Sequence, residues 1–446
     1  MHGPSCALDE ERRDRRMALQ ISEVTLCPSN DLINGASLDY PRPGPVDGYA
    51  FDAYGWVLSK EPVAEVEFVH EGVVIAYCEL EVQRPDVAKK FGSSPRVGFW
   101  KAIGTVGLAP AFTIAVRVVF QGGRRREIAE IRGTQQLTSA FTPTMQPITV
   151  TSPGRSGSTL LMRMLAEHPD IIVHERFPYE QRVCSYWMHF IQVLATPVDT
   201  SQAESFEFWT DRKRLIPFPY FILDPIFAGS VGPTVDRWYG SDQVEEFARV
   251  AQATVESFYR EHARGRKRAT PAFFAEKFAP ADHIRSIMRQ LYPQTREIFL
   301  VRDPRDTLVS VRAFENKRGR GEFAGQLVET DEQLVGLIRS SMLDLTRLWK
   351  SRSQYGTLVR YEDLIRSPTK QIRAMLDALE LDSSANIVAA MVKAGNEATA
   401  NVNAHKTSPD AASSIGRWKR DLEPRLQQMC EEGFDGLLDE LGGSSC

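Results

Sequence analysis

The chain has 446 residues, of which 42% are hydrophobic and 25% are charged, values typical of a globular protein with two or three domains. The formal net charge of -4 gives no global reason to expect nucleic acid or an anionic membrane surface as a partner. Six cysteines are scattered without paired spacing, so we expect reduced, structural thiols and no metal site built from cysteine and histidine.

The first 45 residues are predicted to form an N-terminal tail and a proline-rich linker. A mixed-charge run at 9–16 stands where a secretory signal peptide would need an apolar core, and no apolar run approaches the length of a membrane span. Residues 40–45 read Tyr-Pro-Arg-Pro-Gly-Pro, a stretch that cannot propagate a helix. We therefore expect a cytoplasmic protein without a transmembrane segment.

Residues 46–140 show the pattern of a small β-sandwich. Alternating apolar segments flank two glycine-containing turns, His70-Glu-Gly and Gln121-Gly-Gly, which is typical of hairpins. The paired segments are 64–69 with 73–82 and 112–120 with 126–131. Several short strands at regular spacing favour a sandwich.

Three aromatic residues of this module have two open roles. Trp56, Phe99 and Trp100 would suit a glycan-binding face, or they would pack in the core, which is the commoner role in small β domains. The module is similar to β modules attached to bacterial glycan-modifying enzymes, and this resemblance keeps the glycan role open.

From residue 146 to residue 446, predicted strands alternate with predicted helices. The strands are 148–151, 170–173, 297–301 and 358–361, and the helices are 158–167, 242–264 and 281–291. The apolar strand 297–301 is typical of a strand buried on both faces. We therefore expect an α/β domain with a central parallel sheet, whose ligands bind at the carboxyl ends of the strands.

The stretch 148–161 is predicted to bind a doubly charged anion. A strand, a turn with Gly157 and a helix follow one another, and glycine lets the backbone approach a ligand closely. The N–H groups at the start of the helix favour phosphate or sulfate, and so do the neighbouring side chains of Arg155, Ser156, Ser158 and Thr159. A serine-capped corner without a ligand is the alternative, so a second site is needed to decide.

The loop differs from a Walker A loop. In that loop a lysine follows the second glycine, and a hydroxyl group holds magnesium. Here Ser158 follows Gly157, and the cation, Arg155, comes two residues before the glycine.

A second candidate anion site follows the buried strand 297–301. Arg302 ends the strand, and Ser310 stands eight residues on, inside the next helix. These two can converge on one phosphate, because Pro304 opens that helix and the chain folds back. A Walker B strand would end in a magnesium-binding acid, so we expect an anion site without a metal ion.

Together these motifs resemble those of sulfotransferases that use 3′-phosphoadenosine 5′-phosphosulfate (PAPS) as donor. The family loop reads roughly Pro-Arg-Ser-Gly-Thr-Thr-x-Leu, and residues 154–161 match it with the proline at 153 and Ser158 in place of a threonine. The resemblance implies a P-loop-like three-layer sandwich over 146–446. It also implies that Arg302 and Ser310 bind the 3′-phosphate. The 5′-phosphosulfate would be bound by Arg155, Ser156, Gly157, Ser158 and Thr159.

Two later segments carry the same resemblance. Residues 359–368 resemble the family's Tyr-Glu-Asp strand end, which implies that Tyr361 lies near the adenine. Residues 414–420 resemble the C-terminal Gly-x-Trp segment, which closes over the nucleotide and implies a phosphate-binding role for Arg417. Taken singly, Tyr361 would equally be a packing residue.

The resemblance implies an in-line transfer of the sulfuryl group from PAPS to a hydroxyl group. Arg155 and the N–H groups of 156–159 are predicted to stabilise the sulfuryl oxygens and the leaving phosphate.

The general base is open between two carboxylates. Glu276 resembles the base in the Glu-Lys element of heparan-type members of the family. Glu175 lies near the place used by the tyrosyl-protein members, although the aligned position is Arg176. His174 ranks third, and a structural ion pair with Lys277 is the alternative role for Glu276.

The acceptor is expected to be a carbohydrate or glycan-like molecule, because a β module precedes the α/β domain. Aromatic residues within 177–274 suit sugar rings or phenols, but they suit a hydrophobic core as well. They are Tyr186, Trp187, Phe206, Phe208, Trp209, Phe218, Tyr220, Phe221, Trp238 and Tyr239. Lys317, Arg318 and Arg320 would gate the nucleotide, hold an acidic acceptor or form a solvated charge run.

Two other functions remain open from the sequence. One is a P-loop nucleotide kinase, which the missing loop lysine disfavours. The other is a protein that binds the sulfonucleotide or a glycan without catalysing a reaction.

Overall fold

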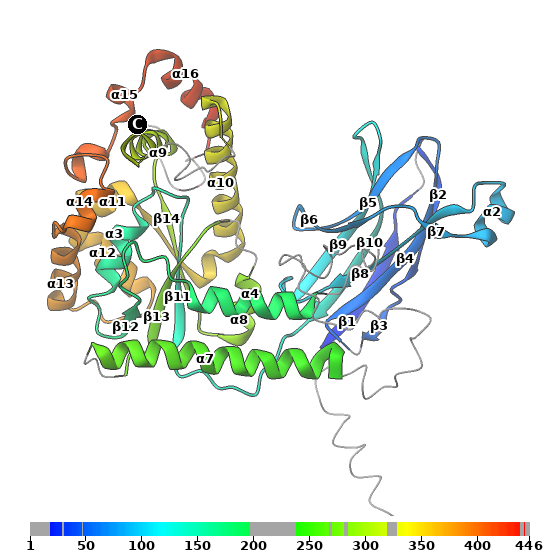
Figure 1. The fold of residues 1–446 in the computed structure, drawn as a ribbon, viewed down its shortest axis with the longest axis horizontal. Helices are drawn as coiled ribbons and strands as arrows, with labels where there is room; N and C mark the ends of the chain where they lie inside the picture. Colours follow the sequence, from blue (N-terminus) through cyan, green and yellow to red (C-terminus); the bar gives the residue numbers. More distant parts are fainter. Residues whose placement is uncertain are drawn as a thin grey trace, which may run out of the picture. The chain divides into compact units, whose positions relative to one another are not determined.

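The computed structural model describes residues 18–28, 31–46, 48–196, 238–266, 270–280, 284–318, 328–437 and 441 (Figure 1). The chain divides into two compact units. The described parts of Met1–Thr142, Tyr186–Gln252 and Ile284–Leu291 form the first unit. Those of Pro143–Ser185, Ala253–His283 and Tyr292–Cys446 form the second.

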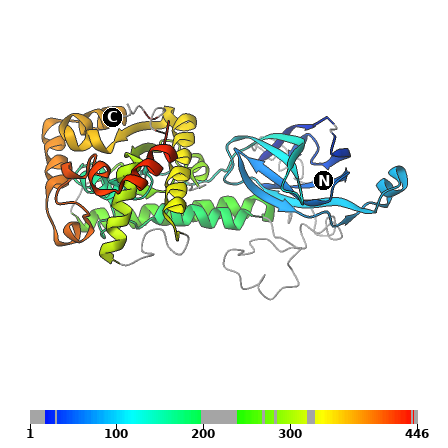
Figure 2. The same cartoon turned by 90° about the horizontal axis from the view of Figure 1, so that it is seen from above.

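The first unit contains two antiparallel sheets, visible in blue to cyan in Figure 2. One sheet has the strand order β3-β1-β10-β9-β5-β6 and the other β2-β4-β8-β7. The strands are β1 (Leu19–Leu26), β2 (Ile33–Tyr40), β3 (Gly44–Val46), β4 (Ala50–Ser59), β5 (Val63–His70), β6 (Val73–Cys78), β7 (Val82–Gln83), β8 (Arg96–Gly104), β9 (Ala111–Phe120) and β10 (Arg125–Gln135). A short helix, α2 (Pro85–Phe91), lies between β7 and β8.

The predicted β-sandwich is confirmed, because side chains from both sheets share one hydrophobic core. Along β9 every second residue from Phe112 to Val118 faces this core, as a half-buried strand requires. Both predicted hairpins are present, β5 with β6 and β9 with β10. Phe99 is a core residue and Trp56 packs on Phe91, which favours packing over glycan binding for these two aromatics.

The prediction of a tail and linker over 1–45 is wrong for the described residues from 18 to 45. β1 pairs with β10, and β2 pairs with β4, so both strands belong to the sandwich. The alternation in β1 buries Leu19 and Ile21 in the shared core. Residues 1–17, including the mixed-charge run, lie outside the described part of the chain. The sandwich therefore begins before residue 46, while its end at 140 and the boundaries at 146–446 stay predictions.

The second unit has a central parallel sheet with the strand order β12-β13-β11-β14-β15. Its strands are β11 (Gln146–Thr151), β12 (Ile171–Val173), β13 (Phe273–Phe278), β14 (Arg296–Val301) and β15 (Gly356–Arg360). β14 is buried on both faces as predicted. Ile298 and Leu300 pack with one layer of helices, while Phe299 and Val301 pack with the other. The α/β three-layer sandwich is therefore confirmed.

Helices cover both faces of this sheet (Figure 1). The layer on one face includes α3 (Ser158–Leu165), α12 (Pro368–Ala378) and α13 (Ala385–Asn396). The layer on the other includes α9 (Pro304–Arg318), α10 (Asp331–Arg352) and α16 (Pro424–Gly433). Short helices follow β15 and α13: α11 (Tyr361–Arg366), α14 (Ala400–His405) and α15 (Trp418–Asp421).

Three further helices are described, of which two were predicted from the sequence. The predicted helix 242–264 is α7 (Gln243–Gly265), and 281–291 is described as α8 (Arg285–Leu291). α4 (Val183–Ala195) precedes them, and parts of α4 and α7 belong to each unit. Within the described residues, no helix combines the length and the hydropathy of a membrane span.

Because β14 and β15 lie close together at Gly356, we expect that replacing this glycine with a larger residue destabilises the sheet. A Cβ atom there would lie 1.9 Å from the backbone oxygen of Glu297. We expect Gly356→Ala to lower the free energy of unfolding by about 1–3 kcal/mol, measured by urea unfolding. In the control Gly336→Ala the new methyl group meets nothing within 4 Å, so that variant should gain roughly 0.5–1 kcal/mol. Equal midpoints for the two variants would contradict this account of the sheet.

Candidate functional site

The loop between β11 and α3, residues 152–157, lies at the carboxyl end of the central strand. Arg155 has φ 64° and Gly157 has φ 92°, so the turn enters the left-handed region twice. Gly157 is also required by packing, because a Cβ atom there would lie 2.4 Å from the Tyr361 ring. The Ser156 hydroxyl donates to the oxygen of Pro153 at 2.7 Å and fixes the turn. The left-handed conformation of Arg155 is therefore strained, and backbone strain of this kind is common at ligand sites.

The second motif meets this loop in space. Arg302 donates from Nη1 to the backbone oxygen of Arg155 at 3.0 Å. Arg155 in turn donates from Nε to Ser310 Oγ at 3.3 Å. The structure therefore brings together the two motifs that the sequence places far apart.

Arg302 is suited to an anionic ligand. Its side chain is buried, and its Nε atom has no hydrogen-bond partner among the described residues. A buried donor without an acceptor is costly, so a phosphate oxygen at this atom would be stabilising.

Tyr361 and Arg417 complete the same network. The guanidinium of Arg302 lies over the Tyr361 ring at 4.6 Å, and the Tyr361 hydroxyl is 3.0 Å from Ser414 Oγ. Arg417 donates from Nη1 to the backbone oxygen of Thr407 at 2.9 Å. The Thr407 hydroxyl is 3.2 Å from Ser310 Oγ, so it links the second motif to the C-terminal segment.

Lys277 is a site residue that sequence reasoning missed. Its Nζ donates to Thr159 Oγ1 at 2.9 Å and to the oxygen of Pro178 at 2.6 Å, which places an ammonium group beside the first turn of α3. Burial lowers the pKa of Lys277 to about 8, although Glu180 opposes this shift. The position of Lys277 in β13 is the signal that could have identified it as a site residue. Every residue of that strand is buried, and side chains alternate, so Lys277 shares the α3 face with Ala275.

Glu276 points to the opposite face of β13. Its carboxylate accepts from the N–H groups of Cys184 at 2.7 Å and Ser185 at 3.1 Å, at the start of α4. It also accepts from the Tyr259 hydroxyl at 2.6 Å. Only 1% of Glu276 is exposed, and burial raises its pKa. Glu276 and Lys277 thus have different partners, which disfavours an ion pair between them. The geometry supports a helix-capping role for Glu276 more directly than its predicted role as a base.

The other two base candidates follow β12. Glu175 is partly exposed and forms an ion pair with Arg266. His174 lies next, with its ring 5.2 Å from that of His262. Burial lowers the pKa of His174, and its Nδ1 atom is buried without a hydrogen-bond partner among the described residues. Both side chains follow the carboxyl end of a parallel strand, the edge where the sequence predicts ligands.

The predicted acceptor segment is described only in part, because residues 197–237 and 267–269 lie outside the described residues. Phe206, Phe208, Trp209, Phe218, Tyr220 and Phe221 lie outside the described residues, as does Arg320. Tyr186 and Trp187 pack on each other and on Phe190 along α4. In the described part of the chain, no group of three or more His, Cys, Asp or Glu side chains is placed to hold a metal ion.

Residues 147–385, more than half of the chain, match the sequence profile of the Sulfotransferase family. The chain belongs to this family. The matched residues include the loop 152–157, Arg302, Ser310 and Tyr361, and they end before Thr407 and Arg417. The protein is thus a sulfotransferase, and its C-terminal segment lies beyond the matched region. A comparison with curated protein sequences found no match.

Several solved structures are similar to this sulfotransferase. The sulfotransferase domain from the Synechococcus PCC 7002 olefin synthase is 18% identical, with a TM-score of 0.38, over 70% of this chain and 100% of its own. Mouse sulfotransferase SULT7A1 complexed with PAP is 14% identical, with a TM-score of 0.36, over 69% and 87%. Sulfotransferase STF9 from Mycobacterium avium is 14% identical, with a TM-score of 0.34, over 67% and 77%.

The capping role of Glu276 predicts a loss of stability in Glu276→Gln. An amide would turn an NH₂ group toward N–H and O–H donors, so we expect the free energy of unfolding to fall by about 1–3 kcal/mol. Glu175→Gln is the matched control, because its carboxylate is partly exposed, and it should cost less than about 1 kcal/mol. Urea unfolding measures both. Equal losses in the two variants would contradict the capping role.

Proposed function

We propose that this sulfotransferase transfers the sulfuryl group of PAPS to a hydroxyl group of a carbohydrate or glycan-like acceptor. The observation that carries the proposal is the network around Arg302, in which the loop and the second motif share hydrogen bonds. One donor molecule would place one anionic group at the loop after β11 and the other at Arg302 and Ser310. The buried Arg302 Nε, which has no partner among the described residues, supports this fit.

The donor would be held by residues of both motifs. In this proposal the N–H groups of 156–159, with Arg155 and Lys277, bind the 5′-phosphosulfate, because helix N-termini and cations favour anions. Arg302 and Ser310 bind the 3′-phosphate. Ser158 and Thr159 contribute to binding the 5′-phosphosulfate, and Arg417 contributes to binding the 3′-phosphate. Tyr361 lies by the adenine.

The transfer is a displacement at sulfur. The acceptor oxygen forms a bond to sulfur while the bond from sulfur to the 5′-phosphate oxygen breaks, and the electron pair leaves on that phosphate. Arg155 and Lys277 would offset the charge that develops there, which is a large contribution in comparable reactions. No metal ion is part of the proposed step.

The acceptor proton must pass to a base during this step. Glu175 and Glu276 remain the two candidates, followed by His174. The partial exposure of Glu175 supports it over Glu276, whose carboxylate already accepts three hydrogen bonds.

The carbohydrate acceptor and the cytoplasmic location rest on the sequence alone. The separate β-sandwich core supports the idea of an added recognition module. A nucleotide kinase is disfavoured by the family match and by Ser158 at the position of the Walker lysine. A binding protein without catalysis stays the second candidate.

Transfer of labelled sulfate from PAPS to a panel of glycans, phenols and lipids tests this function. We expect label in a glycan without added magnesium, and a loss of about 100-fold in kcat for Arg155→Ala at saturating donor, because one transition-state contact is removed. Wild-type turnover in Arg155→Ala would overturn the role of Arg155. Donor binding without transfer to any acceptor would favour the non-catalytic candidate.

The lowered pKa of Lys277 predicts a pH dependence of donor binding. Lys277 is cationic below its pKa of about 8, and an anionic ligand raises the pKa in the complex. Affinity for adenosine 3′,5′-bisphosphate should therefore be constant below about pH 8 and fall above it. Calorimetric titration from about pH 7 to about pH 9 measures this fall, which should be absent in Lys277→Met. The same fall in that variant would contradict the assignment.

A further inference from the structure

One face of α9 is bonded to the segment that follows α14, here called the 406–418 segment. Asp306, Ser310, Ala313 and Lys317 are spaced by four, three and four residues, which places them on one side of the helix. Ser310 already belongs to the proposed donor site. The other polar residues of this stripe have no role in the reaction described above.

Asp306 holds the end of the segment. Its carboxylate accepts from the N–H groups of Gly416 at 2.6 Å and Trp418 at 3.1 Å, on either side of Arg417. Only 1% of Asp306 is exposed, and Trp418 packs in the core beside α9. These two bonds determine where the backbone of Arg417 lies.

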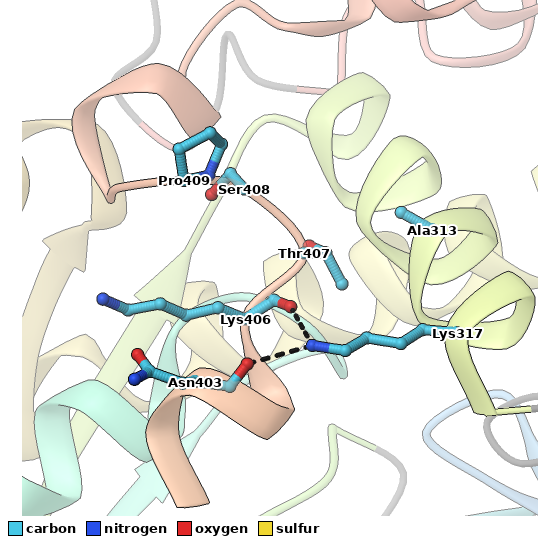
Figure 3. A pocket seen from close by; sticks show the side chains of 7 residues that line it. All are labelled: Ala313, Lys317, Asn403, Lys406, Thr407, Ser408 and Pro409. Carbon is cyan, nitrogen blue, oxygen red and sulfur yellow. Dashed lines mark hydrogen bonds between the residues drawn. The ribbon is translucent and has the colours of Figure 1, made fainter. Parts of the chain in front are cut away.

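Lys317 holds the beginning of the segment. Its Nζ donates to the backbone oxygens of Asn403 at 2.9 Å and Lys406 at 3.1 Å, at the C-terminal end of α14 (Figure 3). A cation at this end of a helix satisfies carbonyl groups that have no partner within the helix. Thr407 follows directly and lies between Ser310 and Arg417.

A pocket of about 440 Å³ lies beside the Lys317 attachment, between α9 and the first residues of the 406–418 segment. Its lining comes from α9 and from the 403–409 stretch: Ala313, Lys317, Asn403, Lys406, Thr407, Ser408 and Pro409 (Figure 3). The segment therefore does not pack tightly along α9 at this point. At its beginning the segment is held by polar attachments, whereas Trp418 packs in the core at its end.

We propose that Asp306 and Lys317 are positioning residues that hold the 406–418 segment against α9, so that Thr407 and Arg417 lie ready beside Ser310 for the 3′-phosphate of the donor. This inference rests on the proposed function. Neither residue contacts the donor. They raise donor affinity because the segment is ordered before binding rather than during it.

Two exposed cations of α9 make a matched test. Lys317→Met removes a positive charge from the helix and also the attachment to Asn403 and Lys406. Arg312→Gln removes the same charge but only an exposed ion pair with Asp331. Asp306→Asn tests the other attachment and keeps the size of the side chain. Lys317→Arg restores the charge and the donor groups.

Hydrogen exchange of the protein without ligand, followed in peptides from 400–420, is the first measurement. We expect faster exchange in Lys317→Met and Asp306→Asn, and wild-type exchange in Arg312→Gln and Lys317→Arg. Unchanged exchange in Lys317→Met and Asp306→Asn overturns the proposal, whatever happens to binding. This measurement needs neither donor nor turnover.

Titration with adenosine 3′,5′-bisphosphate and steady-state kinetics with PAPS form the second measurement. We expect Lys317→Met to weaken binding and raise the KM for the donor about fivefold to tenfold, with kcat nearly unchanged. Arg312→Gln should change either by less than about twofold. Faster exchange with unchanged binding would overturn the link to the donor. If wild-type protein fails to bind this nucleotide, the proposed function fails, and the exchange experiment alone decides the attachment.

Discussion

The arrangement of the site depends on one buried guanidinium group. Arg302 directly follows β14 and donates to the backbone oxygens of Arg155 and Ser414, at 3.0 and 2.8 Å. Arginine remains charged at physiological pH, and a buried charge is costly unless acceptors surround it. The loop after β11 and the C-terminal segment supply those acceptors. Both must therefore lie around the end of β14, and this places the sulfotransferase motifs in one small volume.

The residues around Arg302 also explain why Tyr361 requires glycine at position 157. The Tyr361 ring lies against the guanidinium of Arg302 and leaves no space for a side chain at residue 157. Its hydroxyl reaches Ser414, so one aromatic residue contacts the loop, the second motif and the C-terminal segment. A residue that would ordinarily be explained by packing thus connects three parts of the site.

Strand β13 divides its two charged residues between the two faces of the sheet. The ammonium of Lys277 lies beside Thr159 at the start of α3, where it adds positive charge to the loop. The carboxylate of Glu276 lies on the other face and accepts from N–H groups at the start of α4. The positive end of the α4 dipole offsets part of the negative charge of Glu276. Glu276 therefore reduces the positive potential at the loop after β11 less than it would if it formed an ion pair with Lys277.

Local patterns in the sequence determined the loop, the second motif, the two hairpins and the doubly buried strand β14. Each of these features is determined by residues close together in the sequence. The signals are the alternation of apolar residues, a glycine in a turn, and a proline that opens a helix. The sequence did not reveal β1 and β2 as strands of the sandwich, because their partners β10 and β4 are not joined to them by a hairpin turn. It also could not show which groups Glu276 and Lys277 contact, or find the roles of Asp306 and Thr407. Which face of a strand meets which helix, and which backbone groups a buried side chain reaches, are decided only when distant segments pack together.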